Sequence, residues 1–84
     1  MQRETIIVKG KDGLHARPAA EFVQLCKKIK SDVKIEKDGA QAPGKSIIGI
    51  MSLGISKGDE ITVVVEGDDE TDAMISIKEL LDKE

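Results

Sequence analysis

Hydrophobic and polar residues alternate in part of the chain and recur with helical spacing elsewhere. Between residues 32 and 37, the apolar Val33 and Ile35 alternate with the charged Lys34 and Glu36. This period of two is typical of a β-strand that buries one face. We therefore predict a strand over residues 32–37 with Val33 and Ile35 facing the core.

Two further segments have strand character. Residues 60–66 place apolar side chains at positions 61, 63 and 65, which we expect to face the core. Residues 5–9 are rich in β-branched side chains and are followed by glycines and an aspartate that break regular structure. We predict that they form the first strand.

A tight hairpin is expected after residue 37. Asp38 and Gly39 form a two-residue turn signal, because both positions of such a turn favour positive φ. The returning strand over residues 40–42 is short, and Pro43 stops it. A proline in this position favours the edge of a sheet, and the hairpin makes the pairing antiparallel.

Three segments have the apolar spacing of amphipathic helices. The first covers residues 16–30, and Pro18 fits only in its first turn, so this helix begins within a residue or two of His15. The second covers residues 46–53, with Ser46 as its cap and Gly54 after it. The third follows Asp69, which we expect to cap it. The expected buried positions are Ala19, Phe22, Val23, Cys26 and Ile29 in the first helix, Ile47, Ile50 and Met51 in the second, and Ala73, Met74, Ile77, Leu80 and Leu81 in the third.

The predicted order of elements is β-α-β-β-α-β-α. Helices that are apolar along one stripe must cover one face of the sheet, which gives a two-layer α/β sandwich. A chain of 84 residues supports one modest hydrophobic core, so we expect a single domain over residues 1–84.

Composition excludes several kinds of site. A single cysteine, Cys26, excludes an internal disulfide framework, and a single histidine, His15, excludes a site with two imidazoles. We expect no metal and no cofactor. The chain has no apolar run long enough to span a membrane and no signal-peptide core at its start, which favours a soluble cytoplasmic protein.

The formal net charge of −3 is unevenly distributed. Residues 1–58 contain 11 Lys and Arg against 6 Asp and Glu, whereas residues 59–84 contain 2 against 10. The basic residues are too dispersed, and aromatic residues too few, for a nucleic-acid surface. The acidic segment is typical of a solvated helix.

The stretch from Gly13 to Ala20, with sequence GLHARPAA, concentrates groups that suit an anion. His15 lies just before a helix that starts with a proline in its first turn, close to N–H groups that have no helical acceptor. Arg17 adds a guanidinium whose shape suits phosphate oxygens. These groups together indicate a histidine that receives a phosphoryl group.

This stretch, followed by KSIIGIMSLG over residues 45–54, closely resembles HPr, the histidine-containing phosphocarrier of the bacterial phosphoenolpyruvate:sugar phosphotransferase system. The resemblance extends over essentially the whole chain and implies an open-faced α+β sandwich with a four-stranded antiparallel sheet covered by three helices. It also implies that enzyme I phosphorylates His15 on Nδ1 and that the group passes to a sugar-specific enzyme IIA. By the same resemblance, Arg17 neutralises phosphoryl charge, and the chain is a substrate of partner enzymes rather than an enzyme.

Ser46 has two compatible roles. As an N-cap it stabilises the second helix by about 1 kcal/mol. The resemblance to HPr of Gram-positive bacteria implies that HPr kinase/phosphorylase also phosphorylates it, which brings in a catabolite-control transcription regulator as a further partner. A phosphate there adds roughly −1.5 to −2 charge without unfolding the helix, and should weaken docking of enzyme I.

A docking surface for these partners is implied beside His15. A short helix cannot bury Ile47, Ile48 and Met51 together, so at least one is expected to be exposed, and methionine suits a surface with several partners. From the resemblance to HPr, we expect the partner-binding residues to be Ala20, Gln24, Lys27, Lys45, Ile47, Ile48 and Met51. We expect the protein to act as a monomer.

Two alternatives remain open. Residues 39–46, GAQAPGKS, satisfy the P-loop pattern and would indicate a nucleotide-binding module. The hairpin before this stretch and the short helix after it favour a chance match. The second alternative is a paralogue with a nitrogen-related or regulatory role, although the presence of His15 argues against a purely regulatory one.

Overall fold

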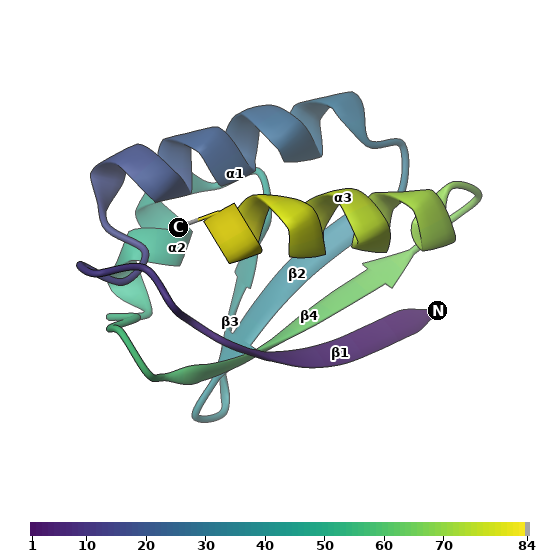
Figure 1. Cartoon of the computed structure of the whole chain (residues 1–84). Helices are drawn as coiled ribbons and strands as arrows, with labels where there is room; N and C mark the ends of the chain where they lie inside the picture. The colour runs from purple at the N-terminus through teal and green to yellow at the C-terminus, as the bar shows by residue number, and fades with distance from the viewer. Residues whose placement is uncertain (84) are drawn as a thin grey trace.

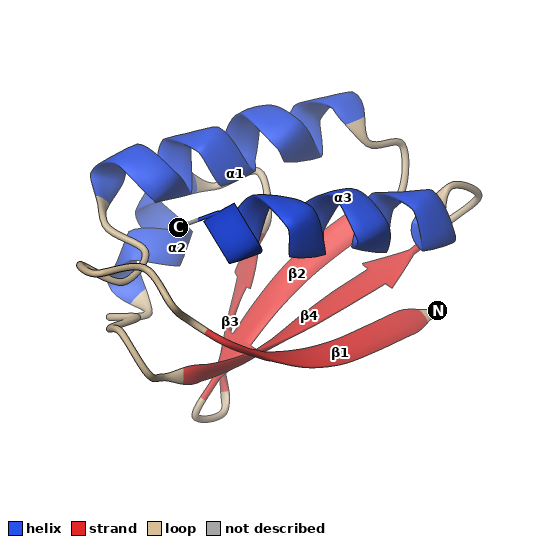
Figure 2. Ribbon diagram, in the orientation of Figure 1, coloured by secondary structure: helices blue, strands red, loops and turns tan. Residues whose placement is uncertain are grey.

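The computed structural model describes residues 1–83 and has the predicted order of elements (Figure 1). Its strands are β1 (Gln2–Ile7), β2 (Asp32–Lys37), β3 (Ala40–Pro43) and β4 (Glu60–Glu66), and its helices are α1 (Ala16–Lys28), α2 (Ile47–Ser52) and α3 (Glu70–Lys83). The strands form one antiparallel sheet in the order β1-β4-β2-β3. All three helices cover the same face of the sheet (Figure 2). The predicted open-faced sandwich is confirmed.

The bounds of β2 and β4 agree with the prediction, whereas β1 is displaced towards the N-terminus. It was expected over residues 5–9 but covers Gln2–Ile7, because the pairing partner decides where a strand extends. Gln2 pairs with Val65 and Ile7 with Glu60, so β1 extends along β4 as far as Val65 and includes polar residues of low strand propensity.

The hairpin between β2 and β3 has the predicted geometry. Asp38 and Gly39 have φ of 49° and 84°, and Lys37 pairs with Ala40. β3 lies at the sheet edge and continues one residue further than predicted, to Pro43, which pairs with Lys34. An edge position tolerates this proline, which has no N–H to donate to a neighbouring strand.

The core lies between the sheet and the helices. Ile35 of β2 and Val63 and Val65 of β4 are fully buried, as are Phe22 of α1, Ile50 of α2 and Ile77 of α3. These are predicted core positions. The fold therefore follows from matching the one-sided pattern of the strands to the one-sided pattern of the helices.

Three details of the helices differ from the prediction. α1 ends at Lys28 rather than residue 30, because the next residue, Ile29, adopts extended backbone (φ −89°, ψ 134°) while its side chain stays buried. Leu80 is only partly buried. Met51, expected on the inner side of α2, is 46% exposed, since this six-residue helix inserts Ile50 into the core as its one fully buried residue.

Asp69 occupies the predicted N-cap position of α3, because its carbonyl accepts the N–H of Ala73, but its carboxylate bonds to another segment. It accepts hydrogen bonds from the backbone N–H groups of Lys30 (3.0 Å) and Ser31 (2.9 Å) and from the Ser31 hydroxyl. Asp69 therefore holds the loop between α1 and β2 against the start of α3. The hydrogen bond from the Ser31 hydroxyl, followed by the one from the Lys30 N–H, lowers the pKa of Asp69.

We predict that Asp69→Ala lowers the Tm at pH 7, because the loop loses these hydrogen bonds. A carboxylate with a depressed folded-state pKa stabilises the fold above its unfolded pKa of about 4, and this contribution is lost as the pH falls through the folded-state pKa. The difference in Tm between wild type and Asp69→Ala should therefore narrow below about pH 4. Circular-dichroism melts of both proteins between about pH 7 and pH 3 measure this difference in Tm. Asp68→Ala, next to Asp69 and exposed, is the matched control and should melt like wild type. A difference that persists unchanged in acid would contradict this role.

Candidate functional site

His15 occupies the N-cap position of α1. Its backbone is extended (φ −78°, ψ −168°), its carbonyl accepts the N–H of Ala19, and its imidazole makes no cap hydrogen bond. The side chain is 42% exposed. The imidazole is therefore accessible at the end of a helix where N–H groups and the positive end of the helix dipole favour an anion.

The loop before His15 is held rigidly in place. The Gly13 N–H donates to the Gly10 carbonyl to close a turn, and the Leu14 N–H donates to the Ile55 carbonyl. Leu14 is buried, and Gly13 has a φ of 67°. A Cβ at Gly13 would collide with the carbonyl oxygen of Ile55, so only glycine permits this close approach. The start of α1, and with it His15, is fixed by this contact.

Asp12 is a neighbour of His15 that the sequence analysis did not identify as a site residue. Its Oδ2 lies 3.9 Å from Nε2 of His15. This distance is that of an electrostatic contact rather than a direct hydrogen bond. Asp12 and His15 are three residues apart in a stretch that contains Gly10 and Gly13, and this spacing across a tight turn could have indicated their contact. The contact leaves Nδ1 as the ring nitrogen that does not face the carboxylate.

Arg17 lies in the first turn of α1, two residues after His15, as predicted. Its side chain is 67% exposed, and its Nη1 lies 3.4 Å from Oε1 of Glu21 one turn further along. A guanidinium at this exposed helix end adds positive charge to the region of His15. The structure thus brings together the two residues that the sequence singled out for anion chemistry.

α2 runs back along α1 from the C-terminal half of α1 towards the loop that precedes it. Gly44, just before α2, is packed so closely that an added Cβ would touch Cys26 of α1, and Ile55, just after α2, is bonded to Leu14. Figure 1 shows α2 below the N-terminal half of α1. The surface of α2 and the start of α1 consequently lie at one end of the molecule.

Ser46 is the N-cap of α2, as predicted. Its Oγ accepts the Gly49 N–H at 3.0 Å, and its carbonyl accepts the N–H of Ile50. The residue is partly buried, while Lys45 before it is exposed. The hydroxyl is thus engaged in a cap that an oxygen of a phosphorylated serine can also make.

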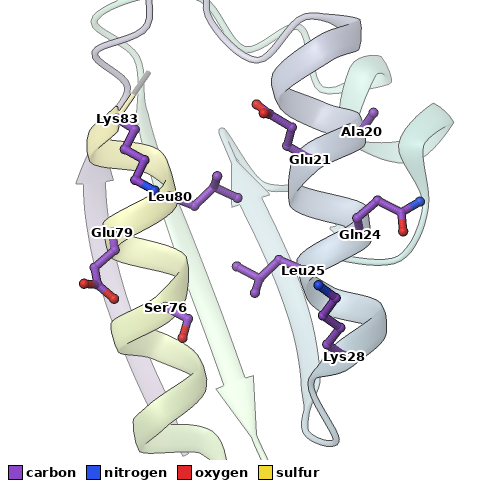
Figure 3. Close-up of a pocket in the computed structure, with 9 residues that line it drawn as sticks. All are labelled: Ala20, Glu21, Gln24, Leu25, Lys28, Ser76, Glu79, Leu80 and Lys83. Carbon is purple, nitrogen blue, oxygen red and sulfur yellow. The ribbon is translucent and has the colours of Figure 1, made fainter.

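An apolar patch formed by Ile48 and Met51 lies on α2. These side chains are 77% and 46% exposed, whereas Ile47 is partly buried against the core. Figure 3 shows Ala20 and Gln24 on the side of α1 that faces α2. Lys27 and Lys45 are exposed. The expected partner-binding residues therefore line adjacent faces of two helices, with Ile47 the least accessible.

A shallow groove also lies between α1 and α3, and Ala20 and Gln24 are among the residues that line it. Leu25 and Leu80 point towards one another across it, with Glu21, Lys28, Glu79 and Lys83 around them (Figure 3). None of His15, Arg17 and Ser46 lines this groove. His15 and Arg17 thus lie outside this groove, with side chains open to solvent.

The P-loop pattern has no matching structure. Gly39 lies in the hairpin turn, residues 40–43 form an antiparallel edge strand, and the Gly44 N–H donates to the carbonyl of Val33. A phosphate-binding loop needs these N–H groups free at the start of a long helix. The interpretation as a chance match is supported by this geometry.

Cys26 and the acidic segment contribute to structure. Cys26 is fully buried, and burial raises the pKa of its thiol to about 12, so it packs as a small apolar residue. Glu70 pairs with the N-terminal amine at 2.6 Å.

Within residues 1–83 no cluster of three or more His, Cys, Asp or Glu side chains is arranged to hold a metal ion. In the same range no helix is long and apolar enough to cross a membrane.

The chain is similar in sequence and in fold to known proteins over nearly its whole length. A family model described as the PTS HPr component phosphorylation site matches residues 2–83. HPr-like protein Crh of Halalkalibacterium halodurans is 46% identical over 84 residues, which is the full length of both chains. The crystal structure of HPr-C-His from Thermoanaerobacter tengcongensis is 47% identical, with a TM-score of 0.95 over 99% of this chain and 93% of that one.

A further similar structure is dimeric. Crh, the Bacillus subtilis catabolite repression containing protein, is described as a swapped, intertwined dimer; it is 42% identical, with a TM-score of 0.79 over 99% of this chain and 95% of that one. We expect a monomer for this chain, whereas this similar protein forms a dimer.

We predict that Gly13→Ala destabilises the fold more than Gly54→Ala. Both glycines have positive φ, 67° and 64°, but only Gly13 is packed, since a Cβ at Gly54 meets nothing within 4 Å. Gly54→Ala should cost about 1 kcal/mol from backbone strain alone. Gly13→Ala should cost about 2 kcal/mol more, because Ile55 must move. Urea denaturation measures both, and equal costs would contradict the close contact as the constraint on the His15 loop.

Proposed function

The chain belongs to the HPr family, and we propose that it carries a phosphoryl group on His15 between the proteins of the sugar phosphotransferase system. In this proposal phospho-enzyme I is the donor and a sugar-specific enzyme IIA is the acceptor. The observation that carries the proposal is the exposed imidazole of His15 at the N-cap of α1 with Arg17 in the first turn. The chain itself is a substrate of these partners and works in the cytoplasm.

The chemistry requires little of this chain beyond that arrangement. The lone pair of Nδ1 attacks phosphorus, the bond from phosphorus to the donor atom of enzyme I breaks, and its electron pair stays on the donor. Arg17 neutralises charge on the phosphoryl oxygens as they pass. The first N–H groups of α1 and the helix dipole attract the same oxygens by about 0.3–1 kcal/mol, which is weak enough for onward transfer.

We further propose that the partners dock on the apolar patch of Ile48 and Met51. Neighbouring apolar side chains that are exposed together mark surfaces that a partner covers, and methionine adapts to partners of different shape. Ala20 and Gln24 extend this surface along α1, and Lys27 and Lys45 add positive charge for acidic partners. An unpaired chain exposes this surface fully, which favours action as a monomer over the intertwined form described for Crh.

Ser46 is proposed as a regulatory site for HPr kinase/phosphorylase, and its phosphorylated form as a ligand of a catabolite-control transcription regulator. Two observations support it. Ser46 lies next to the apolar patch, and its place at the start of α2 tolerates negative charge. Added charge here would oppose docking of enzyme I without unfolding the helix.

A purely regulatory role is the alternative, favoured by the similarity to proteins named HPr-like protein Crh. In that case Ser46 accepts phosphate and His15 does not. A phosphohistidine is labile in acid and a phosphoserine is not, so the acid stability of the phosphate separates these functions.

The carrier function predicts an acid-labile, base-stable label when the protein is incubated with enzyme I and labelled phosphoenolpyruvate. His15→Ala should abolish this label. Arg17→Gln should retain it but acquire it more slowly, by about tenfold or more, because phosphoryl charge is no longer neutralised. Ser46→Ala is the control and should be labelled like wild type. Label that survives His15→Ala would exclude His15 as the acceptor, and no label on folded wild type would favour the regulatory role.

The regulatory site predicts an ATP-dependent, acid-stable phosphate on incubation with HPr kinase/phosphorylase, which Ser46→Ala should abolish. A matched pair of variants separates charge from capping, because asparagine and aspartate cap helices equally well. Ser46→Asp should weaken binding of enzyme I by about fivefold or more, while Ser46→Asn should leave it near the wild-type value. Isothermal titration calorimetry measures both affinities, and equal affinities would contradict regulation through charge.

A further inference from the structure

We propose that Asp12 is a positioning residue that keeps the proton of neutral His15 on Nε2 and so leaves Nδ1 free to accept the phosphoryl group. This inference rests on the proposed carrier function. Its basis is the 3.9 Å separation between Oδ2 of Asp12 and Nε2 of His15.

The fold holds the two side chains in this relation. Asp12 lies in the turn that the Gly13 N–H closes onto Gly10, and His15 begins α1. Between them, Gly13 packs against the backbone of Ile55 and Leu14 is buried. The backbone that joins Asp12 to His15 therefore has little freedom, and the carboxylate is presented to one nitrogen of the ring.

The charge of Asp12 distinguishes the two ring nitrogens. A neutral imidazole carries one proton, on Nδ1 or on Nε2, and the group facing a nitrogen decides which form is favoured. A carboxylate beside Nε2 stabilises an N–H there and opposes a lone pair. The favoured form thus has its lone pair on Nδ1, which the proposed transfer requires.

The same contact acts during the transfer. When the Nδ1 lone pair forms its bond to phosphorus, the proton stays on Nε2 and the ring becomes an imidazolium. The positive charge develops beside the Asp12 carboxylate, which stabilises it, as a buried aspartate does for the catalytic histidine of serine proteases. In the reverse step the electron pair of the broken N–P bond returns to the ring and Nε2 keeps its proton.

The other charged groups near His15 do not duplicate this role. Arg17 carries a positive charge and is directed along α1 towards Glu21 at 3.4 Å. A cation cannot stabilise the proton on Nε2. Within residues 1–83, Asp12 is the acidic residue whose carboxylate lies within 4.0 Å of a ring nitrogen of His15.

The test compares Asp12→Asn with Asp68→Asn, which removes the same charge from an exposed position outside the His15 loop. Long-range ¹H–¹⁵N NMR of the His15 side chain, at a pH where the imidazole is neutral, gives the ratio of the two protonated forms without any partner protein. We expect Asp12→Asn to lower the Nε2–H to Nδ1–H ratio by roughly threefold, because an exposed carboxylate about 4 Å from an N–H stabilises it only weakly. Asp68→Asn should leave the ratio unchanged, and Asp12→Glu should restore part of it.

An unchanged ratio in Asp12→Asn, or an equal change in Asp68→Asn, would overturn the proposal. The rate of labelling by phospho-enzyme I supplies a second readout, which should fall by a similar factor in Asp12→Asn alone. If no variant and no wild-type protein accepts label, the carrier function fails, whereas the protonation ratio still decides the role of Asp12.

Discussion

The close contact between the loop before α1 and the backbone at Ile55 is the constraint on which the placement of His15 depends. Gly13 lies against the Ile55 carbonyl. The Leu14 N–H donates to the same carbonyl, and the Leu14 side chain is buried in the core. This contact joins the start of α1 to the segment after α2. His15, at the start of α1, is thereby placed at the same end of the fold as the exposed surface of α2.

The rest of the fold supplies a rigid base for that contact. One face of the sheet is buried under three helices, and the central strands β4 and β2 provide its most buried residues, including Ile35, Val63 and Val65. Lys37, at the end of β2, donates to the carbonyls of Leu53 and Gly54 after α2 and pairs with Asp59. Before α2, the Gly44 N–H donates to the Val33 carbonyl, so the short helix is held at both ends while it exposes apolar side chains.

The distribution of charge follows the same division between site and support. The residues associated with anions, His15, Arg17 and Lys45, lie in the basic part of the chain. Acidic residues of the C-terminal part act as anchors: Asp69 holds the loop before β2, and Glu70 pairs with the N-terminal amine. Asp12 is the exception, an acidic residue next to the imidazole.

The sequence by itself determined the order of secondary structure and most core positions, and it predicted His15, Arg17 and Ser46 as site residues. These depend on local properties, such as the period of apolar residues, the place of Pro18 in a first turn and the hairpin at Asp38-Gly39. Tertiary structure decided the bounds of β1, because its length follows β4, and the engagement of Asp69 with Ser31, because the partner is 38 residues away. It also decided that Ile50 is buried while Ile48 and Met51 are exposed, and that Asp12 faces Nε2 of His15. Such features depend on which surfaces meet in space, and the periodicity of a single segment carries no information about its neighbours.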